Sequence, residues 1–162
     1  MGKLKIQTVL SIMFISGLFL SGCNDKQVYK EIQNMPNKSW TKENVLTFKP
    51  NMEADKQKHH IQLLVRHIYG FALTEFQIHT EIETPSGKQI EKTITAEVMD
   101  EKREYKSDCL GDYCDLEVSV YDNFTFEETG VYTFKFTQLA DLNPLPYILD
   151  IGLLIQKTEK HE

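Results

Sequence analysis

Cys23 has the surroundings that indicate the most specific chemistry in this 162-residue chain. It follows Ser21 and Gly22 at the end of an apolar run, residues 9–20, which two lysines precede. A basic start, a short apolar run and small residues at the cut are typical of an export signal. The thiol that follows can carry a diacylglycerol thioether, and each buried methylene of such a lipid contributes about 0.8 kcal/mol to membrane attachment. We therefore predict removal of residues 1–22 and lipidation of Cys23, with an ordinary secretory signal as the alternative.

The other two cysteines, Cys109 and Cys114, lie five residues apart on either side of Gly111. An exported chain meets an oxidising compartment, where cysteine pairs form disulfides. We predict a Cys109–Cys114 disulfide that fixes a turn. A zinc site is the alternative, but two thiols without a second pair of ligands are weak evidence for one.

Histidines and aspartates supply the remaining candidates for metal ligands. They are His59, His60, His67, His79, Asp108, Asp112, Asp115 and Asp122. Neighbours on a strand point to opposite faces, so His59 and His60 would not bind one ion together, and we expect solvated histidines. The aspartates match no established calcium loop. The prediction is that the chain binds no metal and no other cofactor.

Catalytic signals are equally weak. No Gly-x-Ser-x-Gly nucleophile motif is present, and we expect Cys109 and Cys114 to form a disulfide rather than to act as nucleophiles. With 24 acidic residues, a pair of carboxylates is certain to occur somewhere and therefore indicates nothing. We predict a protein without enzymatic activity and name no catalytic residue.

Charge and hydropathy limit the possible partners. The formal net charge is −6 and becomes −8 without the two lysines of residues 1–22, which argues against binding nucleic acid. Beyond Cys23, no apolar run approaches the length of a membrane span. We expect a domain that the lipid alone holds at the membrane.

Apolar residues recur with period two through most of the chain. Phe76, Ile78, Thr80 and Ile82 share one face of a predicted strand, the turn 85–88 follows, and residues 89–99 return as a hairpin partner, with Lys92 on its apolar side. Further strands are predicted at 61–69, 116–120, 132–136 and 149–155, the last entered through Asn143–Pro146, whose prolines should exclude a ladder. We predict that Trp40, Tyr132, Phe134 and Phe136 lie in the core.

These strands predict an all-β fold, an antiparallel β-sandwich of about seven or eight strands. Jelly-roll and immunoglobulin-like connections both remain open. The predicted organisation is a signal peptide at 1–22, a lipidated N-terminus and tether at 23–39, the sandwich at 40–158 and a polar tail at 159–162.

A series of landmarks in fixed order follows Cys23 along the whole mature chain. They are Val28-Tyr29, Trp40, Phe48, Leu63–Arg66, Tyr69, Thr84–Gly87, Gly111-Asp112, Phe126–Phe136 and Leu145–Gly152. In this order the chain resembles the gliding-motility lipoprotein GldH family of Bacteroidota. It departs from the family at Tyr147, where a glycine is usual, near 139–140, where a Met-Arg pair is usual, and at 104–108, where the family has a loop with glycine and tryptophan.

The resemblance implies a lipoprotein of gliding motility and of the linked secretion apparatus, with no catalytic residues to transfer. We expect a non-enzymatic interaction subunit that docks on other envelope proteins through an acidic face of the sandwich. A carbohydrate-binding lipoprotein is the alternative, with Tyr105, Tyr113 and Tyr121 as its sugar platform. Residues 24–27 hold a single acid, so we expect the periplasmic face of the outer membrane rather than the cell surface.

Overall fold

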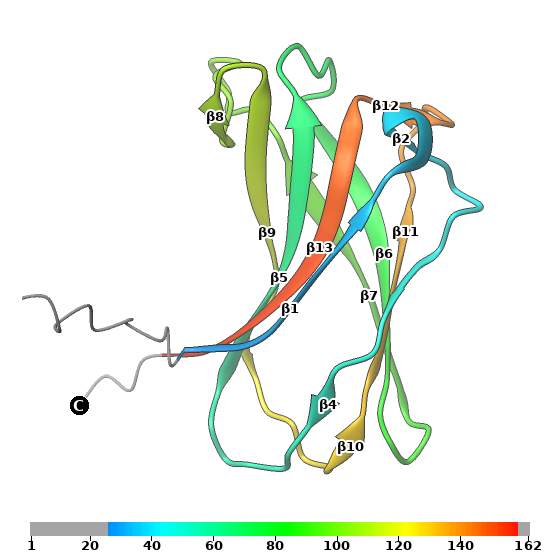
Figure 1. Cartoon of the computed structure of the whole chain (residues 1–162), viewed down its shortest axis with the longest axis vertical. Helices are drawn as coiled ribbons and strands as arrows, with labels where there is room; N and C mark the ends of the chain where they lie inside the picture. The colour runs from blue at the N-terminus through cyan, green and yellow to red at the C-terminus, as the bar shows by residue number, and fades with distance from the viewer. Residues whose placement is uncertain (1–25, 159–162) are drawn as a thin grey trace, which may run out of the picture.

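Two antiparallel sheets pack face to face in the computed structural model, which describes residues 26–158 (Figure 1). The five-stranded sheet has the order β1 (Gln27–Asn34), β13 (Ile148–Lys157), β5 (His59–Ile68), β9 (Tyr113–Phe124) and β8 (Asp108–Leu110). The four-stranded sheet has the order β3 (Leu46–Phe48), β11 (Thr133–Gln138), β6 (Glu75–Glu83) and β7 (Gln89–Glu97). Two short pairs lie at opposite ends, β4 (Asn51–Met52) with β10 (Gly130–Val131) and β2 (Ser39–Trp40) with β12 (Leu145–Pro146). A three-residue 3-10 turn, η1 (Pro36–Lys38), precedes β2.

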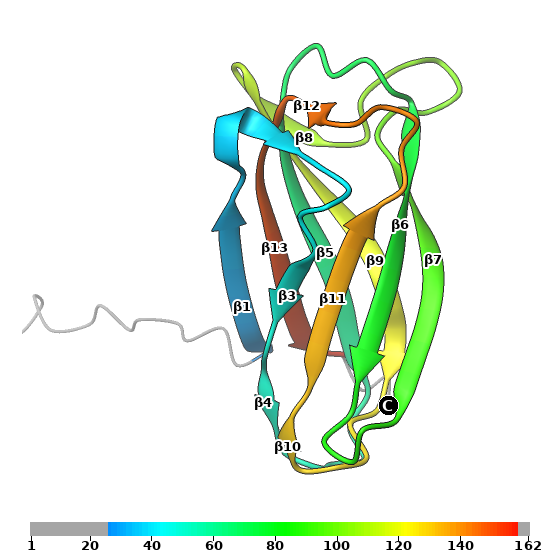
Figure 2. The same cartoon turned by 90° about the vertical axis from the view of Figure 1, so that its right-hand side faces the viewer.

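The order of the eight main strands decides the topology. Along the chain, β1, β3, β5, β6, β7, β9, β11 and β13 alternate between the sheets, except that β6 and β7 form a hairpin within one sheet (Figure 2). The sheets β1-β13-β5-β9 and β3-β11-β6-β7 then face each other, which is the arrangement of a jelly roll. The predicted all-β antiparallel sandwich is confirmed, and the jelly roll is the wiring that the sequence left open.

Period-two alternation explains how these strands face the core. In β6 the side chains of Phe76, Ile78, Thr80 and Ile82 are buried, as predicted, while the residues between them are exposed or half-buried. The strand pairs with β7 along its whole length, from Glu75 opposite Glu97 to Glu83 opposite Gln89. The predicted hairpin is therefore confirmed.

Aromatic side chains fill the space between the sheets. Trp40, Tyr132, Phe134 and Phe136 are all fully buried, which confirms their predicted place in the core. The Trp40 indole N–H donates to the carbonyl of Asn44 at 2.9 Å, so the one polar atom of this ring is satisfied. Phe48 packs edge-on against Phe136 across the β3–β11 pair.

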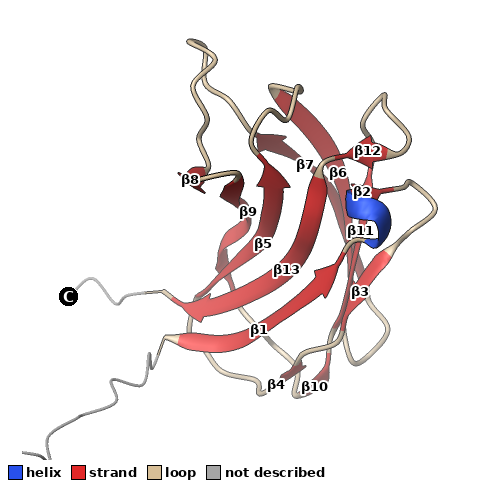
Figure 3. Cartoon of the chain, turned by 45° about the horizontal axis from the view of Figure 1, so that its top comes forward, coloured by secondary structure: helices blue, strands red, loops and turns tan. Residues whose placement is uncertain are grey.

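The predicted boundary between tether and domain needs correction. Residues 23–39 were expected to form a tether, but Gln27–Asn34 is strand β1, which pairs with β13 from Gln27 opposite Gln156 to Asn34 opposite Asp150 (Figure 3). Its side chains are mostly polar and exposed, so period-two hydrophobicity does not reveal it. Main-chain hydrogen bonds to β13 hold it in place. The folded domain begins at Gln27.

The prolines at 143–146 also behave differently from the prediction. Leu145 lies opposite Trp40, and Pro146 lies opposite Ser39 in the short β12–β2 pair. Proline lacks only the N–H donor, so it is tolerated at the edge of a two-residue ladder.

Two histidines were expected in solvent and are instead buried. His59 and His67 are 2% and 1% exposed, since they continue the inward-facing series Ile61, Leu63 and Val65 of β5. The neutral ring of His67 donates from Nδ1 to the carbonyl of Ile68 at 3.1 Å, and its Nε2 accepts from the Ser107 hydroxyl at 2.7 Å. His59 packs edge-on against Phe126, and its Nδ1 is buried without a hydrogen-bond partner.

These buried rings predict a loss of stability in mild acid. Burial lowers the pKa of both His59 and His67 below the ordinary histidine value. Below about pH 6.5 the unfolded chain therefore binds more protons than the folded chain, and the free energy of unfolding falls as the pH falls through that window. Urea unfolding at pH 7.5 and 5.5 should show this decrease. His67→Gln should make the decrease smaller, leaving the contribution of His59, and His79→Gln should leave it unchanged. Equal stability of the parent chain at both pH values would contradict the prediction.

Candidate functional site

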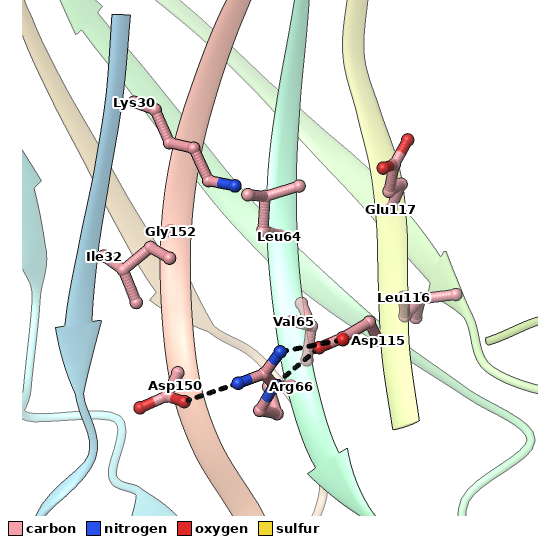
Figure 4. A pocket seen from close by; sticks show the side chains of 10 residues that line it. All are labelled: Lys30, Ile32, Leu64, Val65, Arg66, Asp115, Leu116, Glu117, Asp150 and Gly152. Atoms are coloured by element: carbon pink, nitrogen blue, oxygen red, sulfur yellow. Dashed lines mark hydrogen bonds and ion pairs between the residues drawn. The ribbon is translucent and has the colours of Figure 1, made fainter. Parts of the chain in front are cut away.

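The outer face of the five-stranded sheet carries a groove that runs along β13. Strand register places Ile32 of β1, Gly152 of β13, Leu64 of β5 and Glu117 of β9 in one row across this face. The next row holds Asn34, Asp150, Arg66 and Asp115 in the same strand order. The groove has a volume of about 180 Å³, and Figure 4 shows the ten residues that line it.

Gly152 creates the depression, because it has no side chain between those of β1 and β5. A methyl group in its place would lie 2.9 Å from the Glu31 carbonyl oxygen and 3.0 Å from Cγ1 of Ile32. Ile32 and Leu64 form apolar walls on either side of this glycine, and Lys30 reaches from β1 over β13 toward Leu64 (Figure 4). The floor of the groove is thus apolar, and its rim is charged.

Arg66 organises the charged rim. Its Nε and Nη2 donate to the two carboxylate oxygens of Asp115 at 2.7 and 2.8 Å, a bidentate pair. Its Nη1 lies 4.0 Å from Asp150, whose other oxygen accepts a hydrogen bond from the Asn34 amide. The hydrogen bonds from Arg66 lower the pKa of the Asp115 carboxyl, and those to Asp115 raise the pKa of the guanidinium. Arg66 and Asp115 therefore remain charged at neutral pH.

The β8–β9 hairpin, near the top of Figure 1, extends the row that holds Arg66 and Asp115, because Asp108 of β8 lies opposite Asp115. Leu110 pairs with Tyr113, which lies opposite Ile68 of β5, and the N–H of Ile68 donates to the carbonyl of Tyr147. Gly111 has φ +62° at the first central position of the two-residue loop, where a type II′ turn takes glycine. In this structure Cys109 and Cys114 are joined by a disulfide just below the loop.

We expect this disulfide to contribute modestly to stability. Because it closes a loop of only six residues, its effect on unfolded-chain entropy corresponds to about 2 kcal/mol. The double variant Cys109→Ser with Cys114→Ser should lose about that amount or less in urea unfolding. A much larger loss would show that the bridge holds up the core rather than the hairpin tip.

The other predicted site residues are not brought together. Tyr113 is exposed at the hairpin tip, while Tyr121 lies eight residues further along β9 beneath the Lys92 ammonium, which is 3.7 Å from its ring centre. Tyr105 is packed against the core, and its hydroxyl bonds to the main chain of Gly70 and Phe71. The three tyrosines named as a sugar platform therefore do not form one.

The candidate metal ligands are also dispersed. Asp115 pairs with Arg66, and Asp122 contacts His60 at 3.2 Å and the Ser119 hydroxyl at 2.6 Å. Within residues 26–158 no three histidine, cysteine or acidic side chains are placed to hold one ion. Cys23, the predicted lipidation site, lies outside the described residues. The described part also contains no helix long and apolar enough to cross a membrane.

Comparison with known proteins assigns the chain to a family. Residues 27–155, which extend from β1 almost to the end of β13, match the GldH lipoprotein family. The chain belongs to the GldH lipoprotein family. A relative from Christiangramia forsetii, named gliding motility lipoprotein GldH homolog, is 23% identical over 155 residues, covering 91% of this chain and 94% of the relative.

A solved structure of the Clostridium thermocellum xylanase 10B, comprising its CBM22-1 and GH10 modules with xylohexaose, is similar at a TM-score of 0.35 and 10% identity. That similarity covers 85% of the GldH-family chain but 30% of the xylanase chain.

Two segments that carry the resemblance to the GldH family meet in the groove. Leu63–Arg66 supplies its β5 wall, and Leu145–Gly152 supplies Asp150 and the glycine floor. Sequence reasoning named neither Arg66 nor Gly152 as a site residue, because only the β13–β5 register brings them together. Tyr147 has φ +65°, a conformation that glycine adopts without strain.

Proposed function

We propose that this chain is a lipid-anchored, non-enzymatic interaction subunit of a gliding-motility apparatus and of the secretion machinery linked to it. The lipid on Cys23 holds it in the cell envelope, and the groove on the outer face of the five-stranded sheet receives an apolar side chain from another envelope protein. Membership of the GldH lipoprotein family supports the lipid anchor, and the name of the Christiangramia relative supports a role in gliding motility.

The groove is the observation that carries the interaction role. Its volume of about 180 Å³ is below the about 300–1,000 Å³ typical of small-molecule pockets. A cavity of that size suits one anchor side chain, and protein interfaces concentrate their binding energy in such buried anchors. The apolar floor with a charged rim also follows the usual anatomy of an interface, an apolar centre within a polar margin.

Ile32 offers a direct test, because it is 53% exposed on the groove wall. Ile32→Asn should leave the free energy of unfolding within about 0.5 kcal/mol of the parent chain, as expected for a surface position. It should reduce colony spreading and weaken the partner complex at least ten-fold. Val131→Asn is the matched control, since Val131 is 50% exposed on β10 at the far end of the sandwich.

A photocrosslinking residue at position 32 should capture a defined envelope protein in intact cells, and one at position 131 should not. The Ile32→Asn variant should spread poorly although it is present at normal levels and attached to the membrane. Normal spreading of this variant, or equal capture from both positions, would reject the groove as the docking site.

We further propose that the protein lies on the periplasmic face of the outer membrane. The support is that residues 24–27 contain a single acidic residue. Lipoproteins of Bacteroidota that are sent to the cell surface generally have an acidic cluster just after the cysteine. Protease treatment of intact cells should leave the domain uncut, and cleavage should begin only after the outer membrane is opened. Cleavage in intact cells would place the domain on the surface instead.

A further inference from the structure

We infer that the partner meets this face with a basic segment, in which lysine or arginine side chains flank an apolar anchor. The inference rests on the proposed interaction role and adds the chemistry of the partner. It follows from the charges on the outer face of the five-stranded sheet, from the exposed side chains at the hairpin tip, and from the short distance between the tip and the groove.

Carboxylates outnumber cations on this face. Around the groove and the neighbouring hairpin, the carboxylates are Asp108, Asp115, Glu117 and Asp150, and the cations are Lys30 and Arg66; further along β9, Asp122 contacts His60. Arg66 uses its bidentate donors on Asp115 and also lies beside Asp150. Within the described residues, the side chain of Glu117 accepts a hydrogen bond from the neutral amide of Gln62 at 2.7 Å and from no cation. Within residues 26–158, the groups around the groove and the hairpin therefore keep a net negative charge.

Asp108 is the clearest unmatched charge. It lies directly opposite Asp115 in the β8–β9 ladder, a placement in which like charges repel. Its side chain has no hydrogen bond or ion pair within residues 26–158. Asp112, at the tip of the same hairpin, adds a further carboxylate. The main-chain carbonyl of Asp112 accepts from the N–H of Tyr69, and its side chain has no partner among residues 26–158. A partner cation beside Asp108 would relieve its repulsion with Asp115, and the nearby Asp112 would add to the attraction.

The hairpin tip also exposes apolar and aromatic surface beside these carboxylates. Leu110 is 87% exposed and Tyr113 is 59% exposed, and Tyr147 beyond Ile68 is 50% exposed. A tyrosine ring next to a carboxylate binds lysine and arginine well, because the ring face attracts a cation and the alkyl stem packs on its edge. The chain itself provides an example in the Lys92 ammonium over Tyr121.

The tip and the groove are close enough for one segment to cover both. On β9, Tyr113 marks the row of the tip and Glu117 marks the row of Gly152, so the two rows are four residues apart. At about 3.3 Å per residue this separation is about 13 Å, which four extended residues span. An apolar side chain in the groove would place basic neighbours against Asp115 and Asp108.

The test uses the full chain with a photocrosslinking residue at Leu110 in the bacterium that makes it, and mass spectrometry to identify the captured segment. We expect a segment that contains lysine or arginine next to an apolar residue. The double variant Asp108→Asn with Asp112→Asn should reduce capture at least ten-fold. The control, Glu75→Gln with Glu91→Gln, removes the same charge from exposed positions on the other sheet and should leave capture unchanged.

A defined probe measures the same preference with purified protein. A labelled peptide of alternating lysine and leucine should bind at least ten-fold more tightly than one of alternating glutamate and leucine, by fluorescence anisotropy. The Asp108/Asp112 double variant and an increase from about 0.05 to about 0.5 M salt should each weaken binding, since salt screens exposed charges. Equal binding of both peptides, or equal weakening by the Glu75/Glu91 control, would overturn the inference.

The outcomes separate this inference from the proposed function. Capture of a protein segment without basic residues would overturn the basic partner and leave the interaction role standing. Failure of capture from both position 32 and position 110 would overturn the interaction role and the inference with it. A glycan captured at position 110 would also overturn both, and would favour the carbohydrate-binding alternative.

Discussion

Replacing Trp40 by alanine is expected to lower the free energy of unfolding by about 3–5 kcal/mol, the usual effect of truncating a buried aromatic side chain. Trp40 has no exposed surface, and it lies opposite Leu145 in the short β2–β12 pair. Its main-chain carbonyl also accepts a hydrogen bond from the buried Gln138 amide at 3.3 Å. The substitution would leave a cavity where the connection from β1 to β3 crosses the end of the sandwich.

Circular dichroism during urea unfolding is the appropriate measurement, because Trp40 is the only tryptophan and its fluorescence disappears with it. Trp40→Phe keeps most of the apolar volume and should recover part of the lost stability. Val45→Ala, at a position exposed on the same connection, should change little. An unchanged midpoint for Trp40→Ala would show that the ring does not support the core.

Cys23→Ala is expected to abolish lipidation of the chain, which leaves the precursor uncut or the domain without its membrane anchor. The export segment otherwise supplies no lipid acceptor, and the described domain contains no helix that could span a bilayer. Labelled palmitate should enter the parent protein and be absent from the variant, which should remain uncut or be released from the membrane fraction. Gliding should be lost although the domain still folds.

The two other cysteines provide a matched control for this experiment. The Cys109→Ser, Cys114→Ser variant should incorporate palmitate normally, since the label depends on Cys23 alone. Palmitate in the Cys23→Ala protein would contradict the prediction. Loss of gliding by a Cys23→Ala protein that remains membrane-attached would separate lipidation from anchorage.

Strands with one buried face could be predicted from sequence, and the polar edge strand could not. The alternation of apolar and polar residues in β6 predicts which side chains face the core, because a strand with one buried face has apolar side chains at every second position. β1 is held by main-chain hydrogen bonds to β13, and such bonds can form whatever the side chains are, so the sequence does not reveal them. The buried His59 and His67 were predictable from the same alternation in β5, which was not applied to polar residues.

The site was harder to predict than the fold. Arg66 and Asp115 are 49 positions apart in the sequence, and Asp150 is a further 35 positions along the chain. Their meeting depends on strand order, and period-two patterns do not distinguish a jelly roll from an immunoglobulin-like sandwich. The positive φ of Tyr147, just before β13, could not be predicted either, because a tyrosine does not indicate that conformation.

The early start of β1 has a consequence for the search for partners. If Cys23 carries the lipid as we propose, only residues 24–26 separate it from Gln27, the first residue paired with β13. Four chain steps extend at most about 14 Å, against the roughly 50 Å of a free tether ending at residue 39. The domain would explore a thin layer beside the bilayer, where its effective concentration for membrane-bound partners is high and for distant ones almost zero. Lengthening this connection with glycine and serine should therefore weaken the complex without touching any contact residue.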